Sequence, residues 1–383
     1  MNKNNIFTLS ICFLLLLITF INFGQSNFKY AQASEIEIMA PARGMVVLEG
    51  NTNTVLYEYN KDLELPMAST TKIATAIVAI ENYPNLDNIV KVSDKSVGID
   101  GTSIYLKHGE EIKFKDLLYG LMLASGNDCS VAIAEEVCGE EEFVKLMNDF
   151  AKNIGATNTQ FKNPHGLDQE GHYTTAHDLA LITSYALKND VFKEIASTQY
   201  HTIEETNVYQ TRYLKHKNKL LFSDDNCIGV KTGFTDNAGR CLVNASEKDG
   251  MQVISVVLNC QPMFEECNRL TNLAFNNYIM KDFVLPYNFI NNIAVENGNK
   301  NEIGICTLKG FSLPILKQEV DCYEVEFEMP DVLNAPIEKN SIVGKVKVLY
   351  NGKLIFEDNL FAIDDVKNID ITFMLENIIN NWF

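Results

Sequence analysis

The pattern of apolar and polar positions divides the chain into strand-type and helix-type segments. Two strand-type runs, Gly44 to Glu49 and Val55 to Tyr59, flank the turn residues Gly50 to Thr54, so we expect a β-hairpin there. From Ala68 onward the apolar residues recur at helical spacing, which predicts an amphipathic helix. Its apolar face consists of Ile73, Ala76, Ile77 and Ile80.

Further helices and three later strands complete this part of the chain. Thr175 and Asp178 resemble a capping box and mark the start of one of these helices. The expected helices cover Phe114 to Met122, Asn127 to Val137, Ala176 to Leu187 and Glu265 to about Lys281, and the expected strands cover Cys227 to Thr232, Gly239 to Ala245 and Val253 to Leu258. Because the helices lie between an N-terminal hairpin and C-terminal strands, we predict one α/β domain whose sheet joins both ends of the segment.

After Pro286 the helical periodicity gives way to short strand-type runs, which predicts a small, separate all-β domain. The last stretch, Asp364 to Phe383, places its apolar residues on one helical stripe. This amphipathic helix either lies in a membrane interface or packs on the β domain or a partner protein, and its excess of acidic residues disfavours anionic lipid. The strand-type runs are Ile290 to Val295, Ile303 to Leu308, Cys322 to Phe327, Ile342 to Tyr350 and Lys353 to Phe356.

Length and charge agree with a folded protein of two domains. The chain has 383 residues, of which 46% are hydrophobic, and its 32 Lys and Arg against 50 Asp and Glu give a net charge of −18. Because the sequence has no basic run that would bind phosphate backbones, we exclude nucleic acid as a partner. We expect a signal peptide at 1–33, the α/β domain at 34–285, the β domain at 286–362 and the terminal helix at 363–383.

The first residues have the pattern of a secretory signal peptide. Lys3 precedes the apolar run Ile6 to Phe23, and Ala31, Gln32 and Ala33 supply the small residues of a cleavage site. A retained membrane anchor is the alternative, because the run approaches the length of a spanning helix. The protein is therefore expected to act outside the cytoplasm.

Eight cysteines follow the signal peptide, and their spacing includes no CxxC pair. We expect free, mostly buried thiols and no structural zinc site, because a chain of this length needs no disulfides to fold. The turn from Thr235 to Ala238 should set Cys241 opposite Thr232 across the two strands. We therefore predict no disulfide between Cys227 and Cys241.

The first candidate for chemistry is Ser69-Thr70-Thr71-Lys72, at the start of the amphipathic helix. Residues three apart share a helix face, so the Lys72 amine can reach the Ser69 hydroxyl near the positive end of the helix dipole. A lysine activates a serine only where burial or a neighbouring cation lowers its pKa. Taken alone, S-x-x-K is also common on ordinary helix surfaces.

Two further motifs follow along the chain. Ser125-Gly126-Asn127 directly precedes a helix, where a simple helix cap also explains it. Lys231-Thr232-Gly233 lies on an expected strand, where the glycine would let a ligand approach the backbone. The lysine alone could instead protect a sheet edge from aggregation. All three motifs in this order are far more specific than any one of them.

Together these motifs resemble those of the serine D-alanyl-D-alanine carboxypeptidases among the low-molecular-weight penicillin-binding proteins. The resemblance runs from about Met39 to Phe283, and the later β domain and terminal helix fit the layout of that family. It implies a β-lactamase/transpeptidase-like α/β fold, an antiparallel sheet flanked by helices, followed by the small all-β domain and the amphipathic helix. The segments that carry it are Leu65 to Lys72, Gly120 to Asp128, Asn163 to Asp168 and Gly229 to Thr235.

The resemblance also implies a mechanism. Ser69 would attack the penultimate D-Ala carbonyl of a peptidoglycan stem peptide, with Lys72 as the base. Ser125 would relay a proton to the departing D-Ala, and Asn127 would bind Lys72 and the substrate amide. The substrate-binding residues would be Lys231, Thr232 and Gly233, with Lys231 also keeping Lys72 neutral by like-charge repulsion, and the backbone N–H groups of Ser69 and Phe234 would form the oxyanion hole.

The implied reaction needs no metal or organic cofactor. Penicillins mimic D-Ala-D-Ala, so β-lactam antibiotics should trap Ser69 covalently. Loss of the terminal D-Ala would remove the donor for peptidoglycan cross-linking. The implied location is the outer face of the cytoplasmic membrane or the cell wall.

Four other interpretations remain open. A serine β-lactamase shares these motifs, but we find no Glu motif for a water activator between Asn127 and Lys231. A zinc peptidase built on His165, His172 and His177 lacks the HExxH motif, and structural histidines explain these residues better. The intact motifs disfavour a wall-binding protein without turnover. A transpeptidase is harder to exclude, because water and an acceptor amine compete for the same acyl-enzyme.

Overall fold

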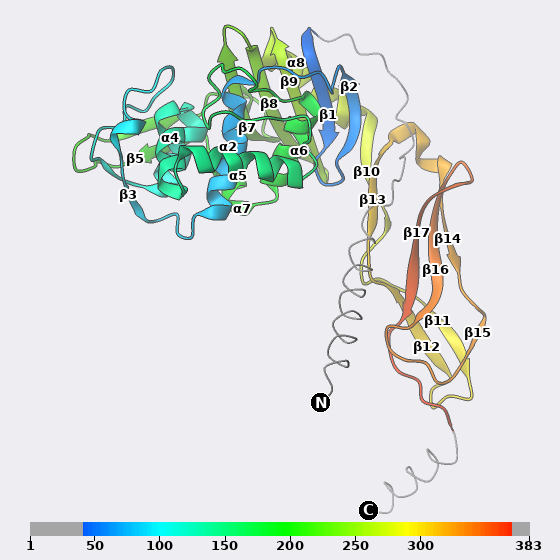
Figure 1. Ribbon diagram of the computed structural model, residues 1–383. Helices are drawn as coiled ribbons and strands as arrows, with labels where there is room; N and C mark the ends of the chain where they lie inside the picture. Colours follow the sequence, from blue (N-terminus) through cyan, green and yellow to red (C-terminus); the bar gives the residue numbers. More distant parts are fainter. Residues whose placement is uncertain (1–40, 370–383) are drawn as a thin grey trace, which may run out of the picture. The chain divides into compact units, whose positions relative to one another are not determined.

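The structure is a computed structural model that describes residues 41–369. This part of the chain forms two compact units (Figure 1). The first contains residues 41–286 and 309–321, and the second contains residues 287–308 and 322–369. Residues 309–321, which lie inside the range expected for the β domain, thus group with the first unit. The expected signal peptide and most of the expected terminal helix lie outside the described residues.

The first unit is built on a five-stranded antiparallel sheet. Its strands are β1 Ala42–Glu49, β2 Thr54–Tyr59, β7 Cys227–Thr235, β8 Gly239–Lys248 and β9 Met251–Cys260, in the order β2-β1-β9-β8-β7. The expected hairpin pairs β1 with β2, and on its other side β1 pairs with β9, where Val46 lies opposite Val256. The two ends of the segment therefore share one sheet, as the sequence pattern predicts.

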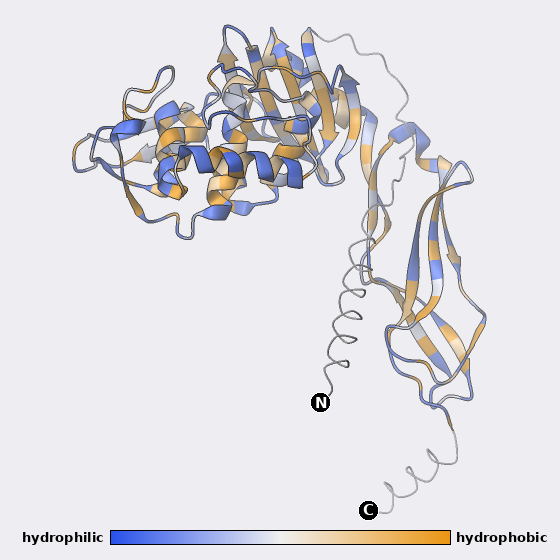
Figure 2. Ribbon diagram, viewed as in Figure 1, coloured by the Kyte–Doolittle hydropathy of each residue, from blue (hydrophilic) through white to orange (hydrophobic). Residues whose placement is uncertain are grey.

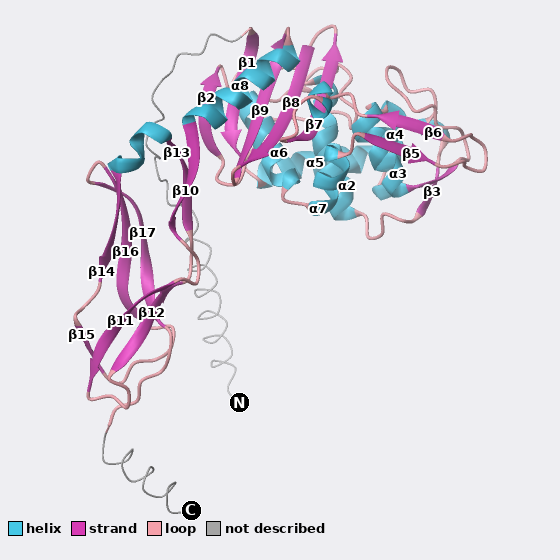
Figure 3. Cartoon of the chain, turned by 180° about the vertical axis from the view of Figure 1, so that it is seen from behind, coloured by secondary structure: helices cyan, strands magenta, loops and turns pink. Residues whose placement is uncertain are grey.

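Helices cover both faces of this sheet. The helices of the first unit are α2 Lys72–Asn82, α3 Phe114–Tyr119, α4 Asn127–Val137, α5 Glu140–Asn153, α6 Ala176–Leu187, α7 Asp190–Ser197 and α8 Met263–Asn277, of which α2, α6, α7 and α8 contact the strands of the sheet. Figure 1 shows α6 in front of the strands, and Figure 3 shows α8 across the opposite face. Because both faces are covered, β9 is buried almost from end to end. Two short strand pairs, β3 Ile89–Lys91 with β4 Glu111–Lys113 and β5 Tyr200–Ile203 with β6 Arg212–Lys215, complete the helical region.

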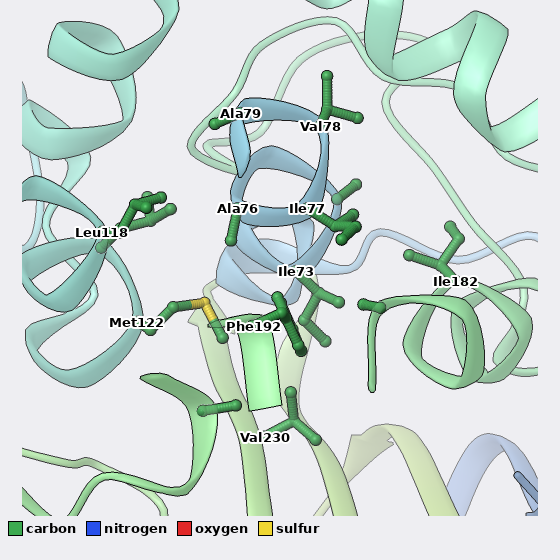
Figure 4. Close-up of a cluster of buried hydrophobic side chains, with 14 of the residues drawn as sticks. Ile73, Ala76, Ile77, Val78, Ala79, Leu118, Met122, Ile182, Phe192 and Val230 are labelled. Carbon is green, nitrogen blue, oxygen red and sulfur yellow. The ribbon is translucent and has the colours of Figure 1, made fainter. Parts of the chain in front are cut away.

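The core of the first unit surrounds α2. Ile73 and Ile77 on its predicted apolar face have no exposed surface. Figure 4 shows Met122, Phe192 and Val230 around the same helix, so side chains from distant parts of the chain meet there. Helix α2 is buried on all sides along its first two turns, which places any polar residue of that segment in apolar surroundings.

The expected end of the last helix in the first unit is wrong. The helix predicted to run to about Lys281 ends at Asn277, and strand β10 Tyr278–Val284 follows it directly. Asn is a weak helix former, whereas the aromatic and β-branched residues of β10 favour a strand. This strand pairs with β13 Phe311–Leu316, from the segment that returns to the first unit.

The second unit contains a six-stranded sheet in the order β14-β16-β17-β12-β11-β15, with strands β11 Phe289–Glu296, β12 Glu302–Thr307, β14 Tyr323–Glu328, β15 Val332–Asn334, β16 Ile342–Tyr350 and β17 Lys353–Ala362. Hydrophobic and polar residues alternate along these strands, whereas apolar residues run almost continuously along the central strands of the first unit (Figure 2). The expected all-β domain is therefore present.

The described part of the expected terminal helix is not helical. Val366, which is 1% exposed, exchanges two backbone hydrogen bonds with Ile337, and Asn368 forms an isolated bridge with Gly298. Residues 364–369 thus belong to the β unit. Burial of the valine and pairing of its backbone stabilise an extended conformation there in place of the expected helix. Residues 370–383 lie outside the described part of the chain. No helix within residues 41–369 is long and apolar enough to cross a membrane.

The register of β7 and β8 differs by one residue from the expectation. Cys241 lies opposite Gly233, not Thr232, because the turn between the strands contains three residues instead of four. Cys227 lies opposite Ser246, far along the strand from Cys241. The eight cysteines of the described residues are free thiols.

Candidate active site

The Ser69 hydroxyl sits on a tight 3-10 turn, η1 Ala68–Thr71, that leads into α2. Ala68 has φ +48°, a strained value for a residue with a side chain, and the turn persists because its surroundings fix it. Thr71 Oγ1 donates a hydrogen bond to the Ala68 carbonyl at 2.8 Å. Gly166, with φ +88°, packs so closely that a Cβ there would lie 2.0 Å from the same oxygen.

The Lys72 side chain is fully buried and makes three hydrogen bonds. Its Nζ lies 2.9 Å from Ser69 Oγ, 2.7 Å from Asn127 Oδ1 and 2.6 Å from the His165 carbonyl oxygen. The amide and carbonyl oxygens can only accept. A neutral amine must therefore give its two N–H groups to them, which directs its lone pair at the Ser69 hydroxyl.

The pKa of Lys72 is adapted to this arrangement. Burial, followed by the positive charge of Lys217, lowers it to about 7. The sequence pattern named Lys231 as the like-charged neighbour that acts on Lys72. Like-charge repulsion between these two buried amines disfavours the protonated form of each, and the pKa of Lys231 lies well below its usual value because of burial and then of Lys72 and Lys217.

The second motif is held by an unusual backbone. A π-helical turn, η3 Gly120–Ala124, interrupts the helix predicted to reach Met122, and it ends at Ser125 with φ +64°. Asn127 Nδ2 donates to the Asp100 carbonyl oxygen at 2.6 Å, which fixes the amide so that Oδ1 faces Lys72. This is more than a helix cap, because both ends of the Asn127 amide are oriented.

The third motif joins the second through Lys231. Its Nζ donates to Ser125 Oγ at 2.9 Å and to the Thr232 carbonyl oxygen at 3.0 Å. The side chain has no exposed surface, so it does not protect the sheet edge that β7 forms. A Cβ at Gly233 would lie 3.1 Å from the Ser69 backbone nitrogen. The glycine therefore admits the turn that carries the serine, and it also lines the pocket, where the sequence pattern predicts a ligand.

A pocket of about 500 Å³ opens over these groups. Lys72 and Lys231 lie behind its wall, and Lys217, Lys219 and Arg240 are the charged residues among those that line it. Sequence reasoning missed these three, because isolated basic residues outside a motif give no signal. The predicted residues that line the pocket are Ser69, Ser125, Asn127, Thr232, Gly233 and Phe234.

Two of the three histidines of the zinc interpretation, His165 and His172, are buried and held in the neutral form. His172 Nε2 lies 2.9 Å from Thr71 Oγ1, and its Nδ1 accepts a hydrogen bond from the Lys162 backbone. Burial lowers the pKa of His165 to about 3 and that of His172 to about 4, so both rings are neutral at pH 7. Within residues 41–369 no group of three or more His, Cys, Asp or Glu side chains could hold a metal ion.

Comparison with known proteins gives the same picture for both units. The family D-alanyl-D-alanine carboxypeptidase, peptidase S11, matches residues 29–262. The family penicillin-binding protein 5, C-terminal domain, matches residues 281–368. D-alanyl-D-alanine carboxypeptidase DacF of Bacillus subtilis is 31% identical over 379 residues, 96% of this chain and 97% of its own. DacC of Escherichia coli is 32% identical over 357 residues, 88% of each chain.

Solved structures agree with these relatives. Penicillin-binding protein 5 from Haemophilus influenzae superimposes with a TM-score of 0.72 at 27% identity, covering 86% of this chain and 99% of its own. A mutant of the Streptomyces K15 DD-transpeptidase gives a TM-score of 0.60 at 31% identity and covers 63% of this chain and all of its own. The chain therefore belongs to the S11 peptidases, the family of serine D-alanyl-D-alanine carboxypeptidases.

Proposed function

We propose that Ser69 and Lys72 carry out the carboxypeptidase reaction of this family and remove the terminal D-Ala from peptidoglycan stem peptides. The observation that carries the proposal is the Lys72 amine, 2.9 Å from Ser69 Oγ and with a pKa of about 7. A base with a pKa near neutrality takes a proton efficiently, is about half unprotonated at pH 7 and is largely unprotonated above it. An ordinary surface lysine would stay charged.

Acylation begins when Lys72 takes the Ser69 proton. Ser69 Oγ then attacks the carbonyl carbon of the penultimate D-Ala, and the electron pair of the carbonyl bond moves to its oxygen. The backbone N–H groups of Ser69 and Phe234, two residues that line the pocket, are assigned to this oxyanion. Such a donor contributes about 3 kcal/mol to the transition state.

The leaving D-Ala needs a proton on its nitrogen. Ser125 is suited to give it as the C–N bond breaks, because its Oγ accepts a hydrogen bond from Lys231, which can replace the proton. The proton that Ser69 loses to Lys72 is thereby balanced by the one that the amine gains. Before deacylation, Lys72 loses the proton that it took from Ser69 to solvent and Lys231 regains one, so both amines return to their starting states. Water then attacks the acyl-enzyme with neutral Lys72 as the base, Lys72 passes that proton to Ser69 Oγ as the C–O bond breaks, and a peptide shortened by one residue is released.

The terminal carboxylate of the substrate is assigned to Thr232 and Lys217. Both line the pocket, whereas Lys231 lies behind Ser125 and is assigned to that hydroxyl. Gly233 acts through its backbone, since its position allows no side chain beside the turn of Ser69. Lys217 thus has two effects: it binds the carboxylate and it holds the pKa of Lys72 down.

Hydrolysis is preferred over transpeptidation as the fate of the acyl-enzyme. The relatives DacF and DacC, which are named carboxypeptidases, match nearly the whole chain, whereas the K15 DD-transpeptidase covers 63% of it. Like the family, the chain should act on peptidoglycan and be acylated by β-lactams. We place it outside the cytoplasm, with the segment 370–383 as a candidate contact with the membrane surface, and removal of that segment should then release membrane-bound protein.

The test is release of free D-alanine from diacetyl-L-Lys-D-Ala-D-Ala by the protein without residues 1–33, beside the Ser69→Ala variant. We expect release that requires Ser69 and that added glycine diverts only slightly into a new peptide. Labelling of Ser69 by a fluorescent penicillin without D-alanine release would contradict the carboxypeptidase assignment and favour a binding protein. Predominant transfer to glycine would favour a transpeptidase.

A further inference from the structure

The pocket carries more positive charge than the single terminal carboxylate of the substrate requires. Although the chain carries a net charge of −18, each charged residue that lines the pocket is basic: Lys217, Lys219 and Arg240. The proposed function uses Lys217. Lys219 and Arg240 remain, and each lies over an aromatic ring of the same pocket, at 5.4 Å from the centre of Phe264 and 5.3 Å from that of Phe234.

Arg240 is directly opposite Phe234 in the β7–β8 pair, so both side chains project from the same face of the sheet. Phe234 is 56% exposed, and Arg240 is exposed as well. The aromatic ring holds the guanidinium at the mouth of the pocket without neutralising its charge. Its donors therefore stay available to a planar anion such as a carboxylate.

Two of the three other arginines of the first unit are bound to acids, and the third, Arg43, lies on β1 away from the pocket lining. Arg212 binds Glu110 at 2.6 Å, and Arg269 binds Glu266 at 2.6 Å. Arg240 forms no ion pair with any acid among residues 41–369. Even Asp168, which accepts a hydrogen bond from Thr235 beside Phe234, is not its partner.

The two remaining cations lie toward different ends of β7. Asn218, next to Lys219, donates to the Gly229 carbonyl oxygen in the first half of the strand, whereas Arg240 lies opposite Phe234 near its end. The proposed reaction puts the terminal carboxylate at Thr232 and the oxyanion at Phe234. An extended substrate advances about 3.4 Å per residue, so the part that precedes the scissile bond runs onward past Phe234.

We infer that Arg240 is a specificity-determining residue that binds a free carboxylate on the acyl side of the scissile bond, in the stem peptide upstream of D-Ala-D-Ala. This inference rests on the proposed function, because that function sets the direction of the substrate. The enzyme would then read two anionic groups, the terminal carboxylate near Lys217 and a second one near Arg240. Amidation of the second group removes its charge and weakens recognition.

The test uses two pairs of peptides that end in D-Ala-D-Ala. Within each pair the peptides differ only in Glu against Gln, placed one or two residues before D-Ala-D-Ala. For each peptide kcat/KM for D-alanine release is measured at low salt. For the native protein we expect a preference of about tenfold for the carboxylate in at least one pair. This preference should shrink as salt is added, because the site is exposed.

Three variants decide where the preference originates. Arg240→Gln should bring the Glu to Gln ratio near one, and Arg240→Lys should keep part of it. Lys219→Gln, a loss of the same charge at the other end of the site, should leave the ratio unchanged. An equal ratio in the native protein and in Arg240→Gln at both positions would overturn the inference while D-alanine release still supports the proposed function. No Ser69-dependent release from any peptide would overturn both.

Discussion

Lysine side chains have opposite environments in the two units. In the first unit Lys72 and Lys231 have no exposed surface, and burial lowers the pKa of each. On the sheet of the second unit Lys345 and Lys347 are bound to Glu357 and Glu328 in water, and the hydrogen bond with Glu328 raises the pKa of Lys347. Lysine becomes a base where water is excluded and remains an ordinary surface cation where it is not.

The largest effect should come from removing the buried base. We expect Lys72→Met to lower kcat/KM for D-alanine release by about a thousandfold, because among residues 41–369 Lys72 is the base that is hydrogen-bonded to Ser69 Oγ. The matched substitution Lys345→Met on the second unit should leave kcat/KM unchanged. Urea unfolding of both variants checks the fold, and a Lys72→Met enzyme with near-native activity would break the comparison.

The comparison of buried and exposed charges can also be tested on stability, with a buried ion pair of the first unit. Arg212 and Glu110 are 6% and 0% exposed at their side chains, and Glu110 Oε1 and Oε2 both accept from the guanidinium. Glu110→Gln leaves the guanidinium charge buried without its counterion, so unfolding should become easier by about 3 to 5 kcal/mol. The free energy of unfolding from urea titration measures this. A loss below about 1 kcal/mol would show that solvent reaches the pair.

A smaller effect should appear in the pH profile. Lys72 must be neutral to act, so kcat/KM should rise with pH through about 7. The positive Lys217 disfavours protonated Lys72, and Lys217→Met should therefore raise the pKa of Lys72 and move this limb to higher pH. Loss of carboxylate binding alone would lower kcat/KM equally at every pH. An unmoved limb would contradict the electrostatic part of the Lys217 assignment.

The smallest effect is expected on the exposed sheet. Glu357→Gln removes the partner of Lys345, which lies 2.7 Å away in solvent. Because water replaces the lost interaction, the urea midpoint should stay within experimental error. A clear drop would mean that the charge pattern of this sheet has a structural role that its exposure does not suggest.

Sequence patterns predict the parts of this fold that local periodicity determines. The hairpin at the N-terminal edge and the buried face of Ile73 and Ile77 are examples. The β10–β13 pair escaped prediction, because a strand that directly follows a helix is read as its continuation and its partner is far along the chain. The expected terminal helix is wrong at Val366 for a related reason. The backbone of Val366 pairs with that of Ile337, which is distant in the sequence, and this pairing decides its conformation.

The residues of the site also fall into two groups, those that sequence motifs predict and those that only the fold reveals. Ser69, Lys72, Asn127 and Lys231 were found because motifs mark them. The structure places Lys72 within hydrogen-bond distance of Ser69 and Asn127, and Lys231 within hydrogen-bond distance of Ser125. Lys217 was missed, because one lysine in a basic surface segment is indistinguishable from its neighbours until the fold turns it toward the pocket. The burial that lowers the pKa of Lys72 is likewise a property of the packed core.

The strand pair β10–β13 also sets the order in which the protein can be completed during synthesis. β10 ends at Val284 and its partner begins at Phe311, so β11 and β12 of the other unit are made in between. When β10 has emerged from the ribosome, the growing chain therefore presents an unpaired strand edge until Leu316, the end of β13, has emerged as well. The catalytic unit thus becomes complete only after synthesis of the β unit has begun, and the two are assembled as interleaved parts of one chain.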